Sequence, residues 1–447
     1  MNIKKIFFGN LSHMSIQSLK NANWLIFEKI FTMSVNLFVS IILARSLGTS
    51  KFGEISYLLS LLTLFSPLFS MGLMGIVTRE VFLYKESEDK VIISAIFIRI
   101  IGCCFFSILI LISLFFITKS FTYRDLFIVL LIGNLFSVFN VCEYWFEAKI
   151  KSKYVSFIRM LTTTIFSILK ITAVFYFSNN IIYLIGAYSL EFVFLNLSVL
   201  YLYLKISLNS LFKKIDLHYS FNLFKESFWL ILSGIASVIY LKIDQVMLAE
   251  MTSMSEVGIY AVAVRMSEVW YFFPSAIVAS FFASIMEAKL ISYDKYVYKL
   301  QNLCNFLFCL ALFIATCVTF IADFVIDILY GANYSDSSNI LVIHIWASLF
   351  IFMRELLTKW LIAERLMKFS LLNNLTGAIL NVVLNFYLIP LYGAIGAAYA
   401  TLISYAFASY FILFAHKESR KMAYIMSKSI ISPIYIPISF LITKYRR

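Results

Sequence analysis

Long apolar stretches follow one another almost from end to end of this chain. Hydrophobic residues make up 62% of the 447 positions and charged residues only 14%. A soluble domain carries about a quarter charged residues. Because about 20 consecutive apolar residues are enough to cross the hydrocarbon core of a bilayer, the sequence predicts an all-α polytopic membrane protein.

The apolar stretches can be divided into about 12 transmembrane helices. The predicted spans are 22–46, 54–77, 91–117, 123–147, 155–177, 181–204, 227–248, 257–286, 300–330, 339–363, 369–390 and 394–415. Lysine and arginine concentrate in alternate short loops, and the other loops hold only Arg45, Lys51, Lys119 and Arg124. This asymmetry places the N-terminus on the cytoplasmic side.

The net charge of +13 is a consequence of that loop asymmetry. Nucleic-acid binding needs a basic face on a soluble domain, and the sequence leaves no room for such a domain. We therefore expect no nucleic-acid partner.

An internal repeat relates the two halves of the chain. Trp24 and Trp229 each open a long apolar stretch, about 205 positions apart. At the same offset, Leu43 matches Leu248, Ala44 matches Ala249, Ser50 matches Ser255 and Gly53 matches Gly258. Two halves in the same orientation, with a site between them, are one architecture of secondary transporters.

The repeat predicts four parts of the chain. We expect an N-terminal six-helix lobe at 1–204, a cytoplasmic linker at 205–226, a second six-helix lobe at 227–415, and a cytoplasmic or interfacial tail at 416–447. The apolar segment 430–443 contains Pro433 and Pro437 and is followed by Arg446 and Arg447. A span there would carry those arginines outside, so an interfacial or re-entrant tail is favoured.

No pattern in the sequence indicates an enzyme, a cofactor or a metal site. The six cysteines lie within apolar stretches without CxxC spacing, and the four histidines are scattered. The chain also lacks a nucleotide-binding glycine-rich loop, and its outside loops are only a few residues long. Transport would therefore be passive or coupled to an ion.

Ionisable groups inside spans are costly, so each is a candidate functional residue. The candidates for a cationic substrate-binding cavity are Arg99, Lys170, Arg265 and Arg354. The candidates for coupling or charge balance are Asp244, Lys242, Glu268 and Glu28. Arg99, Lys170 and Arg354 have no acid at helical spacing on their own helices, which leaves a polar cavity, an acid on another helix or an anionic ligand. Asp244 could bind a coupling Na⁺ or H⁺, or it could neutralise one of the arginines.

Spacing along single helices also allows local ion pairs. Arg265 and Glu268 are three positions apart, and Glu355 and Lys359 are four apart. Such spacings place both groups on one helix face. A structural pair and a substrate contact are equally compatible with this pattern.

Several short motifs in this order resemble Wzx-type O-antigen flippases. These belong to the polysaccharide transporter branch of the multidrug/oligosaccharidyl-lipid/polysaccharide exporter superfamily. The matching segments are Asn23-Trp24-Leu25, Ala44-Arg45-Ser46-Leu47-Gly48, Tyr144-Trp145-Phe146-Glu147, Gly258-Ile259-Tyr260, Leu329-Tyr330-Gly331 and Tyr392-Gly393-Ala394-Ile395-Gly396-Ala397-Ala398. The resemblance covers nearly the whole chain.

The resemblance implies two six-helix lobes around a central cavity that opens alternately to each side of the bacterial inner membrane. It implies a lipid-linked oligosaccharide substrate, the undecaprenyl-diphosphate-linked repeat unit of an O-antigen or capsule. The family's cationic cavity agrees with the four cations above. A polysaccharide polymerase, a chain-length regulator and membrane lipids are the partners expected for lipopolysaccharide biosynthesis.

Two other functions remain open. A multidrug or small-molecule antiporter of the same superfamily would carry acids in its cavity and few cations. A membrane-embedded polysaccharide polymerase would carry a large outside loop with arginines. The four cations within spans and the short outside loops favour the flippase.

Overall fold

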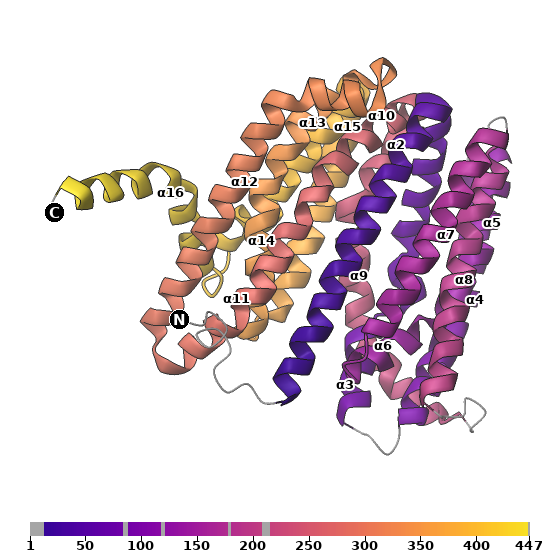
Figure 1. Ribbon diagram of the computed structural model, residues 1–447, viewed down its shortest axis with the longest axis horizontal. Coiled ribbons are helices and arrows are strands. Elements are labelled where there is room, and N and C mark those ends of the chain that lie inside the picture. The colour runs from indigo at the N-terminus through magenta and orange to yellow at the C-terminus, as the bar shows by residue number, and fades with distance from the viewer. Residues whose placement is uncertain (1–12, 84–87, 118–120, 178–179, 208–214, 446–447) are drawn as a thin grey trace. The chain divides into compact units, whose positions relative to one another are not determined.

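A computed structural model describes residues 13–83, 88–117, 121–177, 180–207 and 215–445. Every regular element within these residues is a helix (Figure 1). Ten of the described helical segments are long and apolar enough to cross a membrane. Two of them, Asn23–Leu83 with 61 residues and Met367–Phe414 with 48, are each long enough for two spans. The fold is thus that of a multi-pass helical membrane protein, and about 12 spans fit these lengths.

The two longest helices each bend at one glycine. Helix α2 (His13–Ser70) has Gly48 at φ 74° and ψ 175°, and α15 (Met367–Ser409) has Gly393 at φ 57° and ψ −135°. A side chain disfavours such positive φ values, whereas glycine adopts them freely. Both glycines lie between two predicted spans, so each of these long helices is a pair of spans joined at a glycine.

The described chain forms two compact units. Unit 1 comprises residues 1–46 and 65–235, and unit 2 comprises residues 47–64 and 236–447. Helices α2 and α9 (Leu217–Met251) contribute to both units. This grouping follows contacts between helices, so the predicted lobe boundaries at 205–226 stay a prediction.

Unit 1 is built around an apolar core to which several of its helices contribute. Its further elements are α3 (Met74–Leu83), α4 (Glu88–Ile117), α5 (Phe121–Leu135), η1 (Phe136–Asn140), α6 (Val141–Ala148), α7 (Lys153–Phe177) and α8 (Ile182–Ser207). Helix α8 packs against α7 and α5, and α3 packs against α6. Trp145 is nearly buried, and its ring meets the ring of Tyr203 edge-on at 5.5 Å. The aromatic contact joins α6 to α8.

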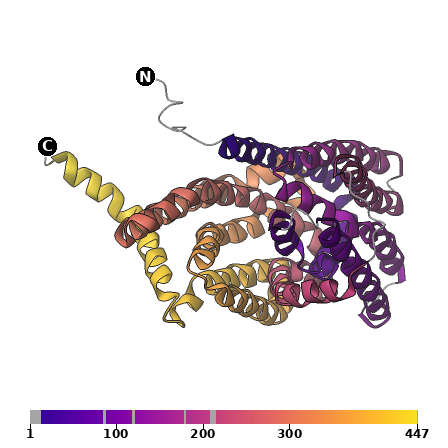
Figure 2. The same ribbon diagram turned by 90° about the horizontal axis from the view of Figure 1, so that it is seen from below.

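Unit 2 contains the remaining helices. These are α10 (Met254–Glu268), η2 (Val269–Tyr271), α11 (Phe272–Ile291), α12 (Tyr293–Tyr330), η3 (Ala332–Tyr334), α13 (Asp336–His344), η4 (Ile345–Ala347), α14 (Ser348–Ala363), η5 (Phe411–Phe414) and α16 (Arg420–Tyr445). Helix α12 packs against α11, α13, α14 and α16. Figures 1 and 2 show the later turns of α16 leaving the other helices of this unit. The proposed interfacial position of this tail stays a prediction.

Short 3-10 turns interrupt the interior of three predicted spans, and a fourth, η5, lies at the end of span 394–415. Spans 123–147, 257–286 and 339–363 are broken at η1, η2 and η4 respectively. Pro274 lies in the first turn of α11, where its missing N–H leaves no helical hydrogen bond unmade. The break at η2 therefore fits the position of this proline.

The repeated glycines meet within unit 2. A Cβ atom added to Gly53 would lie 1.7 Å from the carbonyl oxygen of Met254, and one added to Gly258 would lie 2.1 Å from that of Thr49. Only a residue without a side chain lets two helices approach this closely. The repeat thus marks the crossing of α2 and α10.

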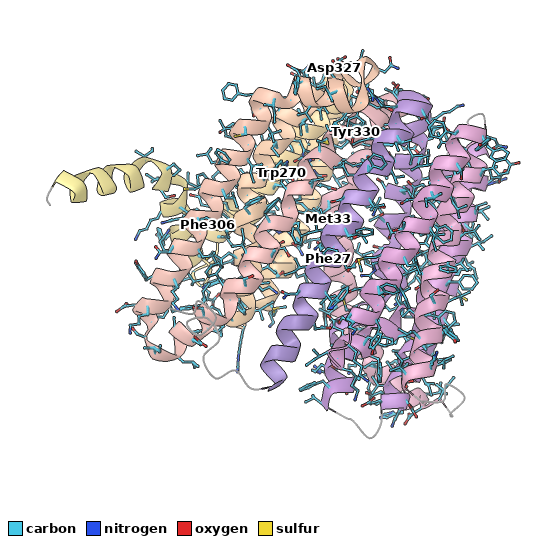
Figure 3. The ribbon with its side chains drawn as sticks, viewed as in Figure 1. Phe27, Met33, Trp270, Phe306, Asp327 and Tyr330 are labelled. Atoms are coloured by element: carbon cyan, nitrogen blue, oxygen red, sulfur yellow. The ribbon has the colours of Figure 1, made fainter. Side chains whose placement is uncertain are left out.

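Large apolar side chains cover the outer faces of the helices. Phe27 on α2 and Phe306 on α12 (Figure 3) have exposed fractions of 56% and 53%. In water such faces would be unfavourable. They are suited to contact with lipid.

Candidate functional site

The predicted site residues fall in both units. Unit 1 contains Glu28, Arg99 and Lys170, whereas unit 2 contains Lys242, Asp244, Arg265, Glu268 and Arg354. Within unit 2, the structure pairs Lys242 with Glu268 and gives Asp244, Arg265 and Arg354 separate surroundings. The three unit 1 residues likewise have different partners.

Arg99 lies next to the C-terminal end of helix α2. Its side chain is almost fully buried, with Nε donating to the carbonyl oxygen of Phe69 at 3.1 Å and Nη1 donating to the hydroxyl of Tyr144 at 3.3 Å. Carbonyls in the last turn of a helix have no partner within the helix, and a cation is favourable at this negative end of the helix dipole. The geometry therefore gives Arg99 the role of a helix cap.

Lys170 on α7 has an acid on another helix. Its Nζ lies 2.5 Å from a carboxylate oxygen of Glu191 on α8 and 3.9 Å from the ring centre of Tyr188. Only 3% of the lysine side chain is exposed. The two charges neutralise each other between α7 and α8. Of the three environments left open for Lys170, the structure shows an acid on another helix.

Glu28 belongs to a charged cluster on the wall of a polar cavity in unit 1. Arg159 on α7 lies 2.7 Å from Glu143 and 3.5 Å from Glu28. A cavity of about 300 Å³ adjoins the cluster and is lined by Asn140, Glu143, Glu147, Ser152, Ser156 and Arg159, among others. Arg159 therefore forms ion pairs with two carboxylates of its own unit.

Asp244 is a buried carboxylate at the meeting of α9, α10 and α15. It accepts hydrogen bonds from the hydroxyl of Tyr260, from the hydroxyl of Thr401 at 3.3 Å and from the backbone N–H of Gln245 at 2.8 Å. In the part of the chain that the structure describes, no cation forms an ion pair with it. A buried carboxylate held only by neutral donors is suited to gaining a proton or a small cation.

Lys242 and Glu268 form an ion pair between α9 and α10. The lysine Nζ lies 2.9 and 3.0 Å from the two carboxylate oxygens. The sequence spacing had also allowed a pair between Arg265 and Glu268, but the structure pairs Glu268 with Lys242. A contact across helices has replaced the local one because the two side chains face each other over the α9–α10 crossing.

Arg265 lies half-buried in unit 2, with its guanidinium carbon 4.9 Å from the ring centre of Phe52. Among the described residues it forms no ion pair. Burial raises the pKa of nearby Tyr334, with Tyr330 adding to this effect and Arg265 opposing it. Arg265 is thus a cation whose hydrogen-bond donors are not committed to a carboxylate.

Arg354 on α14 forms one wall of a second polar cavity, of about 320 Å³. Its Nη2 donates to the side-chain oxygen of Asn374 at 2.5 Å, and its guanidinium lies 4.6 Å from the ring centre of Tyr240. Both partners are neutral. Sequence reasoning found Arg354 but not Asn374 or Tyr240, because neutral polar residues inside spans carry no charge signal.

The start of α9 is tied to α4 at the edge of unit 1. Asp216 lies 2.8 Å from Lys90 and accepts the backbone N–H of Tyr219 at 2.9 Å. The hydrogen bond from Lys90, followed by that from the Tyr219 backbone, lowers the pKa of Asp216. Residues 208–214 of the predicted linker lie outside the described residues.

Comparison with known proteins identifies the family to which the chain belongs. A family model described as polysaccharide biosynthesis protein matches residues 18–286, well over half of the chain. No curated protein matches the chain significantly.

Solved structures match over most of the chain. A lipid II flippase MurJ in an inward closed conformation is 16% identical over 92% of this chain and 92% of that chain, with a TM-score of 0.70. An inward-facing multidrug resistance MATE family transporter of the MOP superfamily is 16% identical over 89% of this chain and 96% of its own, with a TM-score of 0.65. A MOP superfamily transporter from Pyrococcus furiosus is 13% identical over 93% and 97%, with a TM-score of 0.61.

These identities show the fold alone, whereas the family model identifies the chain itself. The helices of both units agree with the MOP exporter fold. The chain belongs to the polysaccharide biosynthesis protein family and is a multi-pass membrane protein with the fold of the MOP superfamily.

Proposed function

We propose that this protein is a flippase for undecaprenyl-diphosphate-linked oligosaccharides. It would carry the repeat unit of an O-antigen or capsule from the cytoplasmic to the periplasmic leaflet by alternating access. The family match supports a role in polysaccharide biosynthesis. The matched lipid II flippase supports a lipid-linked substrate for this fold.

The observation that supports this proposal most strongly is the environment of the Arg265 side chain. It is a cation inside a predicted span, with the ring of Phe52 beside it and no ion pair among the described residues. An arginine without a carboxylate partner is costly in a membrane unless it meets an anion. A guanidinium matches phosphate oxygens in bidentate fashion, so the diphosphate of the lipid carrier is its proposed ligand.

The four predicted cations then divide by their partners. Arg99 caps α2 and Lys170 pairs with Glu191, so each has a partner within unit 1. Arg265 and Arg354 have only neutral partners in the described chain. We therefore assign substrate contact to Arg265 and Arg354, and packing within unit 1 to Arg99 and Lys170.

Ion coupling is assigned to Asp244. Its burial and its three neutral donors support reversible binding of H⁺ or Na⁺. Protonation or cation binding would remove a buried negative charge and would change the packing of α9, α10 and α15. Such a change is the kind of local event that shifts a two-state transporter between its conformations.

The cellular setting follows from the substrate. We place the protein in the bacterial inner membrane, with its N-terminus in the cytoplasm because the basic loops lie on that side. Its product would be used by a polysaccharide polymerase with its chain-length regulator during lipopolysaccharide or capsule assembly.

A multidrug antiporter is the second candidate function. The buried Asp244 and the fold shared with the MATE transporter favour it. A cationic drug would be repelled by Arg265, which favours the anionic lipid-linked substrate.

The test is complementation of a strain that lacks its own flippase, with the matching glycosyltransferases supplied and surface polysaccharide scored on gels. We expect the intact chain to restore polymer and Arg265→Gln, at equal expression, to restore little. Lys368→Gln is the matched control, because Lys368 is an exposed cation in the first turn of α15.

Failure of the well-expressed intact chain to restore polymer would refute the flippase function. Ion-coupled drug efflux, compared between the intact chain and Asp244→Asn, would then test the antiporter. Equal polymer with Arg265→Gln would leave the function standing and remove Arg265 from the site.

A further inference from the structure

Two helical hairpins, one in each unit, share the same backbone at a sequence offset of 215. The hairpin α6–α7 turns at Ile150 with φ 55°, and the hairpin α14–α15 turns at Arg365 with φ 60°. The backbone N–H of Lys149 donates to Trp145, and that of Glu364 donates to Trp360, at 3.0 and 2.9 Å. A positive φ is uncommon for residues other than glycine, so its recurrence at matched positions marks a true repeat.

Each hairpin lines a polar cavity at corresponding positions. Four lining residues in unit 1, Asn140, Glu143, Val155 and Arg159, correspond at the same offset to Glu355, Thr358, Ser370 and Asn374 in unit 2. The cavities have similar volumes of about 300 and 320 Å³. The cavity is therefore a feature of the repeated hairpin, whereas its chemistry differs between the units.

The charged side chains beside the unit 1 cavity pair with one another. Arg159 is bound to Glu143 and Glu28, so its donors face carboxylates of the protein. In unit 2, asparagine occupies the position of that arginine. Arg354 reaches the cavity from α14 and is held by Asn374 and by the ring of Tyr240. Its orientation is fixed without neutralising its charge.

The lining of the unit 2 cavity combines hydrogen-bond donors and acceptors with apolar side chains. Its polar groups come from Ser237, Arg354, Glu355, Thr358, Ser370, Asn373 and Asn374, and its apolar groups from Leu241, Tyr271, Ile351, Leu357, Leu361 and Ala408. One arginine and one glutamate leave no net charge, and a glutamate in the wall would repel a diphosphate. A neutral ligand rich in hydroxyls fits better, because planar amide and guanidinium groups can bind adjacent hydroxyls in pairs.

The size and exposure of the cavity agree with such a ligand. Its volume lies at the small end of ligand pockets, which begin at about 300 Å³, so it has room for about one sugar ring. Thr358 is exposed, and Arg354, Ser370 and Asn374 are half-buried, so the rim is accessible from the surface of unit 2.

We propose that the cavity beside Arg354 binds one neutral sugar of the lipid-linked glycan, and that it contributes to sugar specificity. This inference rests on the proposed function and divides the substrate between two places. The diphosphate goes to Arg265, whereas a sugar goes to Arg354 and Asn374. Arg354 would thus bind sugar hydroxyls and not phosphate.

The test measures binding to the purified full-length protein in nanodiscs with two probes. One is lipid-linked oligosaccharide extracted from membranes of the source cells, and the other is undecaprenyl diphosphate without sugar. The cavity variants are Asn374→Leu and Ser370→Ala. Thr376→Val is the matched control, because Thr376 lies on the same helix but does not line the cavity and donates its hydroxyl to the carbonyl of Leu372.

We expect the intact protein to bind the lipid-linked oligosaccharide more tightly than undecaprenyl diphosphate. Each cavity variant should weaken the oligosaccharide by about tenfold, the order expected for a lost hydrogen bond, with no change in the Kd of undecaprenyl diphosphate. Thr376→Val should change neither Kd. Thermal unfolding of each variant verifies that the fold is retained.

The other outcomes separate the two proposals. If the intact protein binds neither probe, the flippase function fails. If it prefers the oligosaccharide but the cavity variants bind it equally well, the sugar site is refuted and the function stands. If the variants weaken both probes to the same extent, the cavity holds the diphosphate and the sugar assignment is overturned.

Discussion

Substitution of Arg99 by methionine should destabilise unit 1 and leave substrate recognition intact. The guanidinium makes hydrogen bonds of 3.1 Å to the Phe69 carbonyl and 3.3 Å to the Tyr144 hydroxyl, and both partners are buried. A buried acceptor that loses its partner costs about 1–3 kcal/mol. Removing the buried charge relieves part of its own desolvation. We therefore expect a net loss of about 2 kcal/mol in the free energy of unfolding.

Unfolding in mixed micelles with increasing denaturing detergent measures this loss. Arg265→Met is the matched control, because Arg265 contacts the Phe52 ring and its removal should cost less than about 1 kcal/mol. Transport per folded molecule should persist in Arg99→Met and fall in Arg265→Met. A stable Arg99→Met protein without transport would refute the helix-cap role and return Arg99 to the substrate site.

Two further predictions concern packing and pH. Gly53→Ala should lower stability by about 3 kcal/mol, because the new Cβ would lie 1.7 Å from the Met254 carbonyl oxygen. Gly75→Ala, with no neighbour within 4 Å, should not, and equal midpoints in thermal melts would disprove the close crossing. The lowered pKa of Asp216 contributes stability that is present above the ordinary aspartate pKa and lost as pH falls through the lowered value. Asp216→Asn should therefore lower the unfolding midpoint at neutral pH, and a difference that persists in strong acid would contradict this origin.

The spans were predictable from the sequence because apolar length alone determines whether a helix crosses a membrane. The turns between spans one and two, and between spans eleven and twelve, were also visible. Gly48 and Gly393 lie in those turns at positive φ. By contrast, the 3-10 interruptions at η1 and η4 lie in the interior of predicted spans. Neither contains a glycine or a proline that would mark it.

The partners of the charged residues were much harder to predict. Glu191 lies on the helix after Lys170, and Lys242 reaches Glu268 from a different helix. Spacing along one helix says nothing about such contacts, which depend on how helices rotate against each other. The partner of Arg99 is a backbone carbonyl, a group that every residue has and that no sequence pattern distinguishes.

The second repeat offset is a signal that the sequence did contain. Trp145 and Trp360 both precede a tight turn between two helices, at an offset of 215. The first offset, between Trp24 and Trp229, is about 205, so the second half has gained about ten residues between Gly258 and Trp360. A search at one fixed offset therefore misses the hairpins, and with them the correspondence of Arg159 with Asn374.

That correspondence shows how one repeated hairpin can serve two purposes. In unit 1 the arginine at this position ties together Glu143 and Glu28 and so holds α7 to α6 and α2. In unit 2 the matching asparagine cannot neutralise a carboxylate, and it orients Arg354 instead. In unit 1 the arginine of the cavity wall is paired with carboxylates of the protein. In unit 2 the change to asparagine leaves the hydrogen-bond donors of the wall available for a ligand. On this reasoning Asn374→Arg would place a second guanidinium beside Arg354, and like-charge repulsion would disrupt the cavity of unit 2 while the hairpin backbone remained.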